Sequence, residues 1–216
     1  MEDLLKDYIE EHIQDIEKGD FYDLFRSPLS EGLADALTAA GIDFLHASVY
    51  TPPYCFYNSS ITELTIPSHI HTLSMCTFKR CENLVKCVLP HNLKTIEDLC
   101  FVHCSSLEEL NIPDTVISIG VGAFIDCSSL KQVTLPSNIA VIPDSCFGSC
   151  DNLTSLTIPT SVKQIGTECF SNASNLKSLK YLGTKQQFKD IVKDRYWRRY
   201  SAIKTVTCSD GVLRYK

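Results

Sequence analysis

Apolar residues recur along the middle of this chain at every twenty-third position. Residues 61–176 align as five successive copies of that length, with no insertion or deletion between them. Each copy has an apolar–x–apolar–proline segment, and the prolines of these segments are Pro67, Pro90, Pro113, Pro136 and Pro159. Each copy also has a phenylalanine at one fixed position, and this column consists of Phe78, Phe101, Phe124, Phe147 and Phe170. Such self-similarity indicates a repeat protein built from stacked units.

Each copy predicts two short extended segments. After Leu107, the alternation of side chains places Leu110 and Ile112 inward and Glu109 and Asn111 outward, as in a β-strand. The proline that follows has no N–H group, so it ends the strand. Apolar residues three and six positions beyond each proline predict a second extended segment.

The rest of each copy predicts a turn and explains the stacking. The short segment over residues 123–127 predicts a single helical or 3₁₀ turn that directs Phe124 and Cys127 to the interior. A unit this short cannot bury its apolar face alone, so each phenylalanine is expected to cover the next one. Successive coils then rise by about 4.8 Å, the usual distance between neighbouring strands.

These columns resemble the BspA-type leucine-rich repeat, whose consensus runs approximately L-x-x-L-x-I-P-x-S/T-V-x-x-I-G-x-x-A-F-x-x-C-x-x-L. The copies most similar to it are NIPDTVISIGVGAFIDCSSL (residues 111–130) and TIPTSVKQIGTECFSNASNL (residues 157–176). The resemblance implies a right-handed leucine-rich-repeat solenoid that is used for binding, with no catalytic residues to carry over. The predicted fold class is therefore α/β: a solenoid of five repeats with a helical N-terminal cap and an α/β C-terminal cap.

The segment before the repeats predicts two helices. Residues 4–16 carry an apolar stripe at helical spacing. A second helix is predicted over residues 27–41, with Ser27 as its N-cap and Pro28 in its first turn. Residues 55–61 then read as a truncated half-repeat. We interpret residues 1–60 as a helical N-terminal cap over the first coil, because solenoids need capping units. A helical tag that binds a partner is the alternative.

The period fails after Leu176, and the last forty residues predict a different unit. Residues 177–181 predict one more strand, residues 183–192 a turn and a short helix, and residues 203–208 a strand that turns at Asp210-Gly211. Similar terminal units often close BspA-type arrays. The expected organisation is thus a cap (1–60), a solenoid (61–176) and a basic C-terminal cap (177–216).

Four of the eleven cysteines occupy one column of the repeat. The column reads Cys81, Cys104, Cys127 and Cys150, followed by Ala173. Zinc sites favour pairs of ligands two to four residues apart, whereas this column follows the packing period. We therefore interpret its cysteines as small core residues and expect no metal and no cofactor. A metal site, or disulfides between stacked thiols, are the alternatives.

Residue patterns typical of enzymes are missing from the sequence. The six histidines are scattered along the chain. No Gly-x-Ser-x-Gly elbow, phosphate-binding loop or recurring pair of acids is found. We therefore expect a protein that is not an enzyme and predict no catalytic residue.

The outward positions of the first strands are the candidate binding residues within the repeats. They are Glu63, Thr65, Lys86, Glu109, Asn111, Gln132, Thr134 and Thr157. None is a Trp, Tyr or Arg, the residue types that dominate binding hot spots. A solvated β face with favourable threonine packing is therefore the alternative interpretation.

Charge divides the chain into an acidic and a basic end. Residues 1–60 contain three basic and twelve acidic side chains, whereas residues 177–216 contain eleven basic and three acidic ones. Trp197, Arg198 and Arg199 lie in the basic segment and belong to residue types enriched in interface cores. They form a second candidate partner-binding site. The alternative is that Trp197 packs onto the last coil while the arginines are solvated.

The sequence as a whole favours a cytoplasmic protein–protein interaction module. The net charge is −6, the N-terminus does not resemble a secretory signal, and no run of eighteen apolar residues predicts membrane insertion. A protein partner is expected, and nucleic acid is the least favoured one. The alternatives are a cell-surface adhesin or host-contact protein, as the family resemblance suggests, and a self-assembling, phage-like component joined head to tail.

Overall fold

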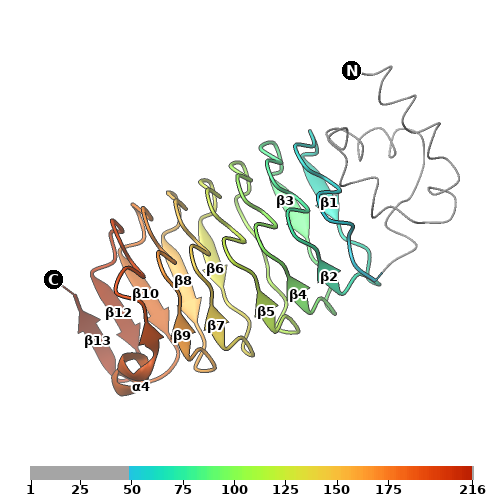
Figure 1. Cartoon of the computed structure of the whole chain (residues 1–216). Coiled ribbons are helices and arrows are strands. Elements are labelled where there is room, and N and C mark those ends of the chain that lie inside the picture. The colour runs from blue at the N-terminus through green and yellow to red at the C-terminus, as the bar shows by residue number, and fades with distance from the viewer. Residues whose placement is uncertain (1–48, 216) are drawn as a thin grey trace, which may run out of the picture.

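The structure is a computed structural model that describes residues 49–215 of the chain. These residues form an elongated stack of about six coils, whose order in space follows their order in the sequence (Figure 1). The two helices predicted over residues 4–16 and 27–41 lie outside the described residues. In the repeats, each coil contains a short second strand and a turn segment, and all but one also contain a short first strand. The exception is the strand predicted around Glu109, where the structure has only isolated bridges.

The first strands of the coils form a ladder of parallel strands. Its members are β1 (Glu63–Thr65), β3 (Lys86–Val88), β6 (Gln132–Thr134), β8 (Ser155–Ile158), β10 (Ser178–Tyr181) and β12 (Thr205–Cys208). Within the repeats the register equals the sequence period, so Glu63 lies beside Lys86, and Gln132 lies beside Ser155. A final strand, β13 (Gly211–Arg214), pairs antiparallel with β12 and covers the last parallel edge.

The second strands form two shorter parallel sheets. One contains β2 (Thr72–Leu73), β4 (Thr95–Ile96) and β5 (Ser118–Ile119), and the other contains β7 (Val141–Ile142), β9 (Gln164–Ile165) and β11 (Val192–Lys193). In five of these six strands the second residue is buried and the first is not. The second strand therefore anchors the coil with one apolar side chain.

The turn segment between the second strand and the next coil is not helical, so the prediction of a helical or 3₁₀ turn is wrong. In residues 75–80, Thr77 N donates to Ser74 O at 3.2 Å, whereas Phe78 N donates to Cys100 O of the next coil at 2.8 Å. The second and sixth residues of this segment have φ of 56° and 62°. A helix would use every N–H group along its own axis. Here alternate N–H groups bond to the neighbouring coil instead.

The phenylalanine column forms the centre of the core, as predicted. Its five rings are fully buried, and neighbouring rings stack with centroids 4.9 to 5.9 Å apart and interplanar angles of 9° to 19°. Phe56 extends the stack by one ring, 5.2 Å from Phe78. At the other end Trp197 meets Phe170 edge-on, at an interplanar angle of 82°. The stack therefore ends at Trp197.

Thiols of the cysteine column hydrogen-bond to the coil before them. The Sγ–O pairs are Cys104 with Phe78 (3.1 Å), Cys127 with Phe101 (3.2 Å) and Cys150 with Phe124 (3.2 Å). All of these thiols are fully buried. Their burial raises the pKa of each one above the usual range of a cysteine, so the thiol remains protonated. Each cysteine thus fills a small apolar site and satisfies a carbonyl oxygen, which supports its interpretation as a packing residue.

Two glycines in the Ile–Gly step are required by close contact between coils. Asp144 Oδ1 accepts a hydrogen bond from Thr167 N at 2.7 Å and lies against Gly166. A Cβ atom at Gly166 would overlap Asp144 Oδ1 and lie 2.6 Å from Asp144 N. Asp98 and Gly120 of an earlier pair of coils have the same arrangement. Glycine at this step makes room for an acidic residue of the preceding coil.

The last coil is longer than the others. A count that assumes a constant period therefore misses it and gives only five repeats. Val192 lies beside Gln164 and Lys193 beside Ile165, so paired positions are further apart in sequence here than within the repeats. The extra length holds the helix α4 (Lys185–Asp190), which begins at the N-cap Thr184. Asp210 Oδ1 accepts a hydrogen bond from Lys185 N at 2.7 Å at the start of this helix. The predicted strand, short helix and Asp210-Gly211 turn are present in the C-terminal segment.

Replacing the central phenylalanine should destabilise the stack strongly. Phe124→Ala leaves a cavity between two stacked rings, and we expect it to lower the free energy of unfolding by about 3–5 kcal/mol. Denaturant unfolding of the full chain measures this loss. Val121→Ala is the matched control, because Val121 is 46% exposed and its truncation should cost about 0.5 kcal/mol or less. An unchanged unfolding midpoint for Phe124→Ala would contradict the inward position of the column.

Two glycine substitutions test the packing between coils. Gly166→Ala forces a methyl group against Asp144 and should cost roughly 1–3 kcal/mol of stability. Gly148→Ala is the control, because a Cβ there would lie 3.4 Å from Ser145 O and Ser171 Oγ, an ordinary contact. Thermal unfolding of both variants should separate them clearly. Equal melting temperatures would show that the Asp144–Gly166 contact is not restrictive.

Native-state alkylation tests the environment of the thiols. Because burial raises their pKa, the column thiols carry little thiolate at pH 8, and we expect native alkylation on the order of tenfold slower than in denaturant. Because the pKa of these thiols is higher in the folded chain than in the unfolded one, their protonated form favours folding. This contribution to stability is complete below the ordinary thiol pKa of about 8.5 and is lost as the pH rises above it. Mass spectrometry counts the modified residues. Rapid labelling of Cys127 in the folded protein would contradict the prediction, and so would native disulfides or stoichiometric zinc.

Candidate protein-interaction surfaces

The predicted strand residues lie together on one face of the solenoid. The parallel register aligns Glu63, Lys86, Glu109 and Gln132 in one row across neighbouring coils. The other row consists of Thr65, Val88, Asn111, Thr134 and Thr157. All of these residues are exposed except Thr157, which is half-buried. We call the outward-facing residues of β1, β3, β6 and β8, together with Glu109 and Asn111, the strand face.

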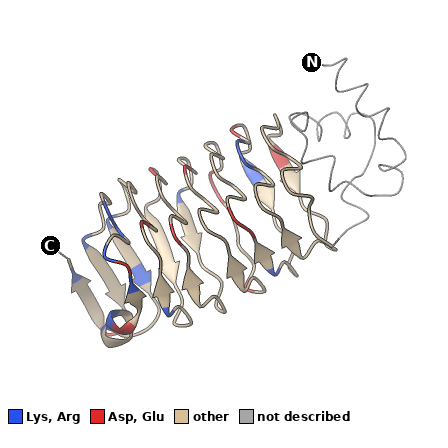
Figure 2. Ribbon diagram, viewed as in Figure 1, with Lys and Arg blue, Asp and Glu red and all other residues tan. Residues whose placement is uncertain are grey.

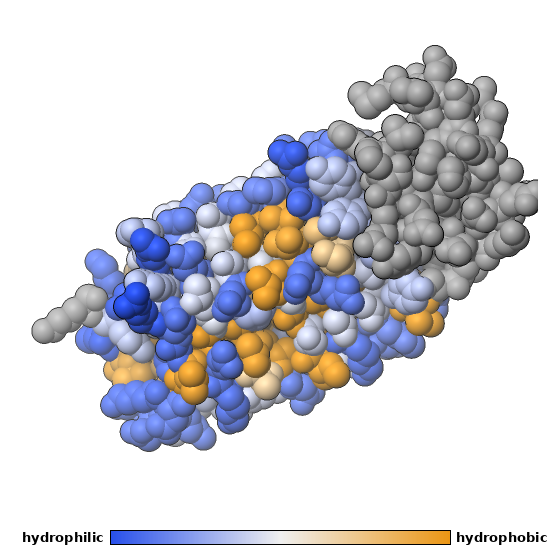
Figure 3. Space-filling model, in the orientation of Figure 1, coloured by the Kyte–Doolittle hydropathy of each residue, from blue (hydrophilic) through white to orange (hydrophobic). Residues whose placement is uncertain are grey.

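Three adjacent hollows follow the strand face across the first coils. Their volumes are about 140 Å³ beside Glu63 and Thr65, about 270 Å³ between β3 and Glu109, and about 190 Å³ between Asn111 and β6. The largest is lined partly by Val85, Val88 and Leu89. Val85 and Val88 are 44% and 42% exposed. Apolar surface also gathers in the middle of the side of the molecule drawn in Figure 3.

The strand ladder opens at the coil between β3 and β6. Glu109 forms only single bridges to Lys86 and Gln132, where the other coils have strands of three or four residues. Beyond the strand ends of other coils, Ile66 N donates to Val88 O and Leu135 N donates to Thr157 O. In the described part of the chain, the equivalent backbone bonds from residues 89 and 112 are absent. Glu and Asn have low β-propensity, which fits the opening at this coil.

Charges of both signs alternate over the strand face. Lys86 lies between Glu63 and Glu109 within the first row. At the edge of the face, Lys131 Nζ lies 2.5 Å from Glu108 Oε2, and this hydrogen bond raises the pKa of Lys131. The face therefore combines polar groups of both signs with an apolar hollow. The sequence pattern predicts the polar positions but not the hollow, because Val85 and Leu89 lie outside the two outward rows.

The second predicted site lies in the last turn segment, residues 195–200. Its three candidate residues differ in exposure: Trp197 is buried, Arg198 is half-buried and Arg199 is exposed. Trp197 is only 6% exposed and packs edge-on against Phe170, Phe188 and Tyr215. It is thus a core residue, as the alternative interpretation predicts. Arg198 is half-buried, with its guanidinium 4.8 Å from the ring centroid of Tyr215.

Arg199 is exposed and belongs to a cluster of arginine and tyrosine side chains, whose other members are not among the predicted site residues. Its guanidinium lies 4.7 Å from the ring centroid of Tyr200 and 5.3 Å from that of Tyr196. Arg195 lies over the same Tyr196 ring at 4.3 Å. We call Arg195, Tyr196, Arg199 and Tyr200 the Arg–Tyr stack. The basic and aromatic composition of the segment is the sequence signal for it, but only the turn geometry decides which members face solvent.

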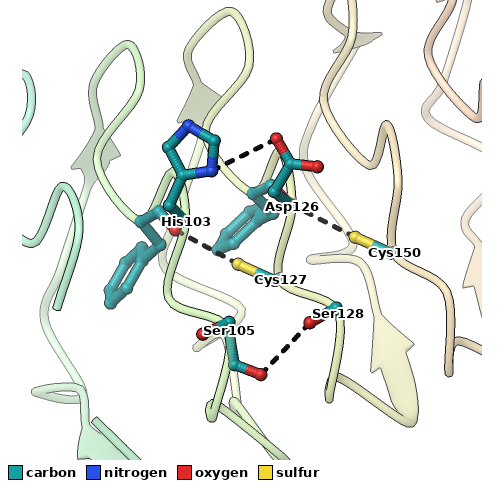
Figure 4. A network of polar contacts seen from close by, with 8 residues as sticks. His103, Ser105, Asp126, Cys127, Ser128 and Cys150 are labelled. Atoms are coloured by element: carbon teal, nitrogen blue, oxygen red, sulfur yellow. Dashed lines mark hydrogen bonds and ion pairs between the residues drawn. The ribbon is translucent and has the colours of Figure 1, made fainter. Parts of the chain in front are cut away.

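Another polar network lies along the turn segments of the middle coils (Figure 4). His103 Nδ1 lies 3.3 Å from Asp126 Oδ2 at the surface. Below them, the thiols of Cys127 and Cys150 donate to backbone carbonyl oxygens of Phe101 and Phe124, as described above. Their raised pKa does not favour a thiolate nucleophile. These contacts link neighbouring coils.

The described region has neither a cluster of side chains suited to a metal ion nor a membrane-spanning helix. Among residues 49–215, the acidic, histidine and cysteine side chains form no group of three that could hold a metal ion. None of the described helices is long and apolar enough to cross a membrane.

Solved structures of bacterial leucine-rich-repeat proteins share this fold. A Treponema pallidum (T. pallidum) leucine-rich repeat protein has a TM-score of 0.61 at 24% identity, over 71% of this chain and 79% of that one. A leucine-rich repeat protein from Eubacterium ventriosum has a TM-score of 0.54 at 23% identity, over 76% of this chain and 50% of its own. The pneumococcal vaccine antigen PcpA has a TM-score of 0.51 at 19% identity, over 71% and 43%.

The comparison with protein families covers most of the chain. No curated protein matches it. The family described as "BspA type Leucine rich repeat region (6 copies)" matches residues 50–210. This match includes the longer last coil and the half-repeat before the first, which agrees with the extent of the stack. The chain therefore belongs to the BspA-type leucine-rich repeat family.

Proposed function

We propose that this chain is a non-enzymatic protein-interaction module that binds a polypeptide partner on its strand face. The observation that carries the proposal is the row of three hollows over the candidate residues, with the largest beside the opening of the strand ladder. Hollows with mixed apolar and polar linings are where a partner's side chains can be buried while their polar groups stay paired.

The chemistry of the face indicates the kind of polypeptide that fits it. Val85 and Val88 offer apolar contact, while Lys86, Glu108 and Glu109 bring charges of both signs to the same lining. A partner segment with one apolar side chain between charged residues would match this arrangement. Alternating charges favour selectivity for a matched sequence, since like charges placed together cost several kcal/mol.

The terminal units are proposed to act as caps. β13 runs antiparallel to β12 and covers the last edge of the strand ladder, and Trp197 ends the phenylalanine stack. Both features support a capping function for residues 177–216. For residues 1–60 the proposal rests on the sequence pattern alone, together with the general need of solenoids for a polar capping unit.

The second candidate function is a surface adhesin or host-contact protein. It is favoured by the likeness to PcpA, a pneumococcal vaccine antigen. The cytoplasmic module and the surface protein use the same binding face but differ in location. Fractionation of the source cells, followed by surface labelling of intact cells, separates them: label on this chain supports the surface protein, and a cytoplasmic fraction without label supports the module.

Peptide selection tests the strand face directly. We expect peptides selected on the full chain from a displayed library to share a motif. Their affinity should fall at least about tenfold, or about 1.4 kcal/mol, with Val88→Asp, because this change places an unpaired charge in the hollow. Ile117→Asp is the matched control, since Ile117 is 60% exposed and outside the face. Thermal unfolding verifies that both variants fold. Peptides that bind Val88→Asp as well as the unchanged chain would contradict the proposal.

A further inference from the structure

The Arg–Tyr stack is an ordered cationic surface at the C-terminal end of the solenoid. Its side chains interleave in space, with each guanidinium lying over at least one tyrosine ring at 4.3 to 5.3 Å. Tyr196 and Tyr200 remain 38% and 73% exposed. Guanidinium groups held against aromatic rings lose less conformational freedom on binding than free side chains do. The stack is therefore prepared to bind an anionic group.

A carboxylate already occupies one side of this surface. Arg199 Nη1 lies 3.0 Å from Glu168 Oε1 of the preceding coil, while Arg199 Nη2 donates to the hydroxyl oxygen of Tyr200 at 3.0 Å. Arg195 makes no ion pair with any residue between 49 and 215. Arg199 thus shows that this surface can pair with a carboxylate, and Arg195 offers a second cation to which another carboxylate can bind.

The chain itself contains a carboxylate-rich segment, attached at the opposite end of the stack. Residues 1–48 hold twelve acidic and three basic side chains, whereas residues 177–216 hold three acidic and eleven basic ones. In Figure 2, several stretches of ribbon near the C-terminal end are blue, the colour of Lys and Arg. Seven levels of strands at about 4.8 Å separate residue 49 from the last coil by roughly 30 Å. This exceeds the screening length of about 10 Å at 0.1 M salt.

We propose that the Arg–Tyr stack of one copy binds the acidic residues 1–48 of a second copy, so that the chains associate head to tail. The contact is heterologous, because the surfaces that meet are different and each copy carries one of each. Such contacts leave a free surface at both ends of the pair and can continue into longer assemblies. The inference stands apart from the strand face, which this contact leaves uncovered.

Sedimentation velocity of the full chain over a range of concentrations tests the association. We expect the average mass to rise with concentration at about 50 mM salt and to fall to that of single chains at about 1 M, where the screening length is about 3 Å. Arg195→Glu with Arg199→Glu should weaken association at least tenfold at low salt. Arg195→Lys with Arg199→Lys keeps the charge but loses the planar stacking, and should weaken it less.

Matched variants separate a specific contact from net charge. Lys177→Glu with Lys189→Glu changes the net charge by the same amount at two other exposed residues of the C-terminal segment and should leave association largely intact. Thermal unfolding verifies that each variant is folded.

Mixing tests the head-to-tail geometry. The changes Glu10→Lys, Glu11→Lys and Glu17→Lys leave nine acidic and six basic side chains in residues 1–48, in place of twelve and three, and keep the Arg–Tyr stack. The double arginine reversal has the opposite defect. Each should associate more weakly alone than the unchanged chain does, and a mixture should associate again, because each variant carries the charges that the altered surface of the other attracts.

Three outcomes would overturn the proposal. They are a chain that stays single at every concentration, association that survives the arginine reversal, and a mixture that forms no pairs. A change of shape that is independent of concentration would instead indicate that residues 1–48 fold back onto their own chain.

Discussion

The contact between one coil and the next is the constraint on which the rest of the structure depends. No coil has enough apolar surface to fold alone, so each phenylalanine ring is buried only because another ring lies about 5 to 6 Å away. The turn segments reinforce this stacking, because alternate N–H groups bond to the neighbouring coil. Left-handed backbone at non-glycine positions such as Leu99 and Ser145 persists within this bonding pattern. Local conformation is set here by the neighbour and not by the propensity of the segment itself.

The same dependence accounts for the distribution of polar and apolar residues. Inward columns are almost uniform along the stack, since each must match the coil on both sides, and even the thiols are used to satisfy a carbonyl oxygen of the preceding coil. Outward positions have no such neighbour and differ from coil to coil. The strand face and the last turn segment are two such outward surfaces, and they are the places where we infer contact with another polypeptide. A rigid interior thus leaves the exterior free to specialise.

Much of this arrangement can be predicted from the sequence, because repetition multiplies a weak local signal. The period identifies the strands, the buried phenylalanines and the outward rows that include Glu63 and Asn111. Features that depend on comparing two coils are not predictable in this way. The turn geometry, the hollow beside Val88 and the loss of pairing at residue 109 all arise between coils. The last coil does not follow the period, because it is longer than the repeats. The exposure of Arg195 and the burial of Trp197 depend on the conformation of the turn that contains them.

The contact between Asp144 and Gly166 has a consequence for how such an array can change length. An aspartate in one coil needs a glycine in the next, and the pairs Asp98–Gly120 and Asp144–Gly166 lie two coils apart. In the middle repeats, a coil that carries the aspartate therefore alternates with a coil that carries the glycine. Removing or inserting a single coil would set aspartate against a larger side chain, or glycine against nothing. Two coils together are therefore the smallest block of the middle repeats that can be added or removed without leaving an aspartate or a glycine of this contact unmatched.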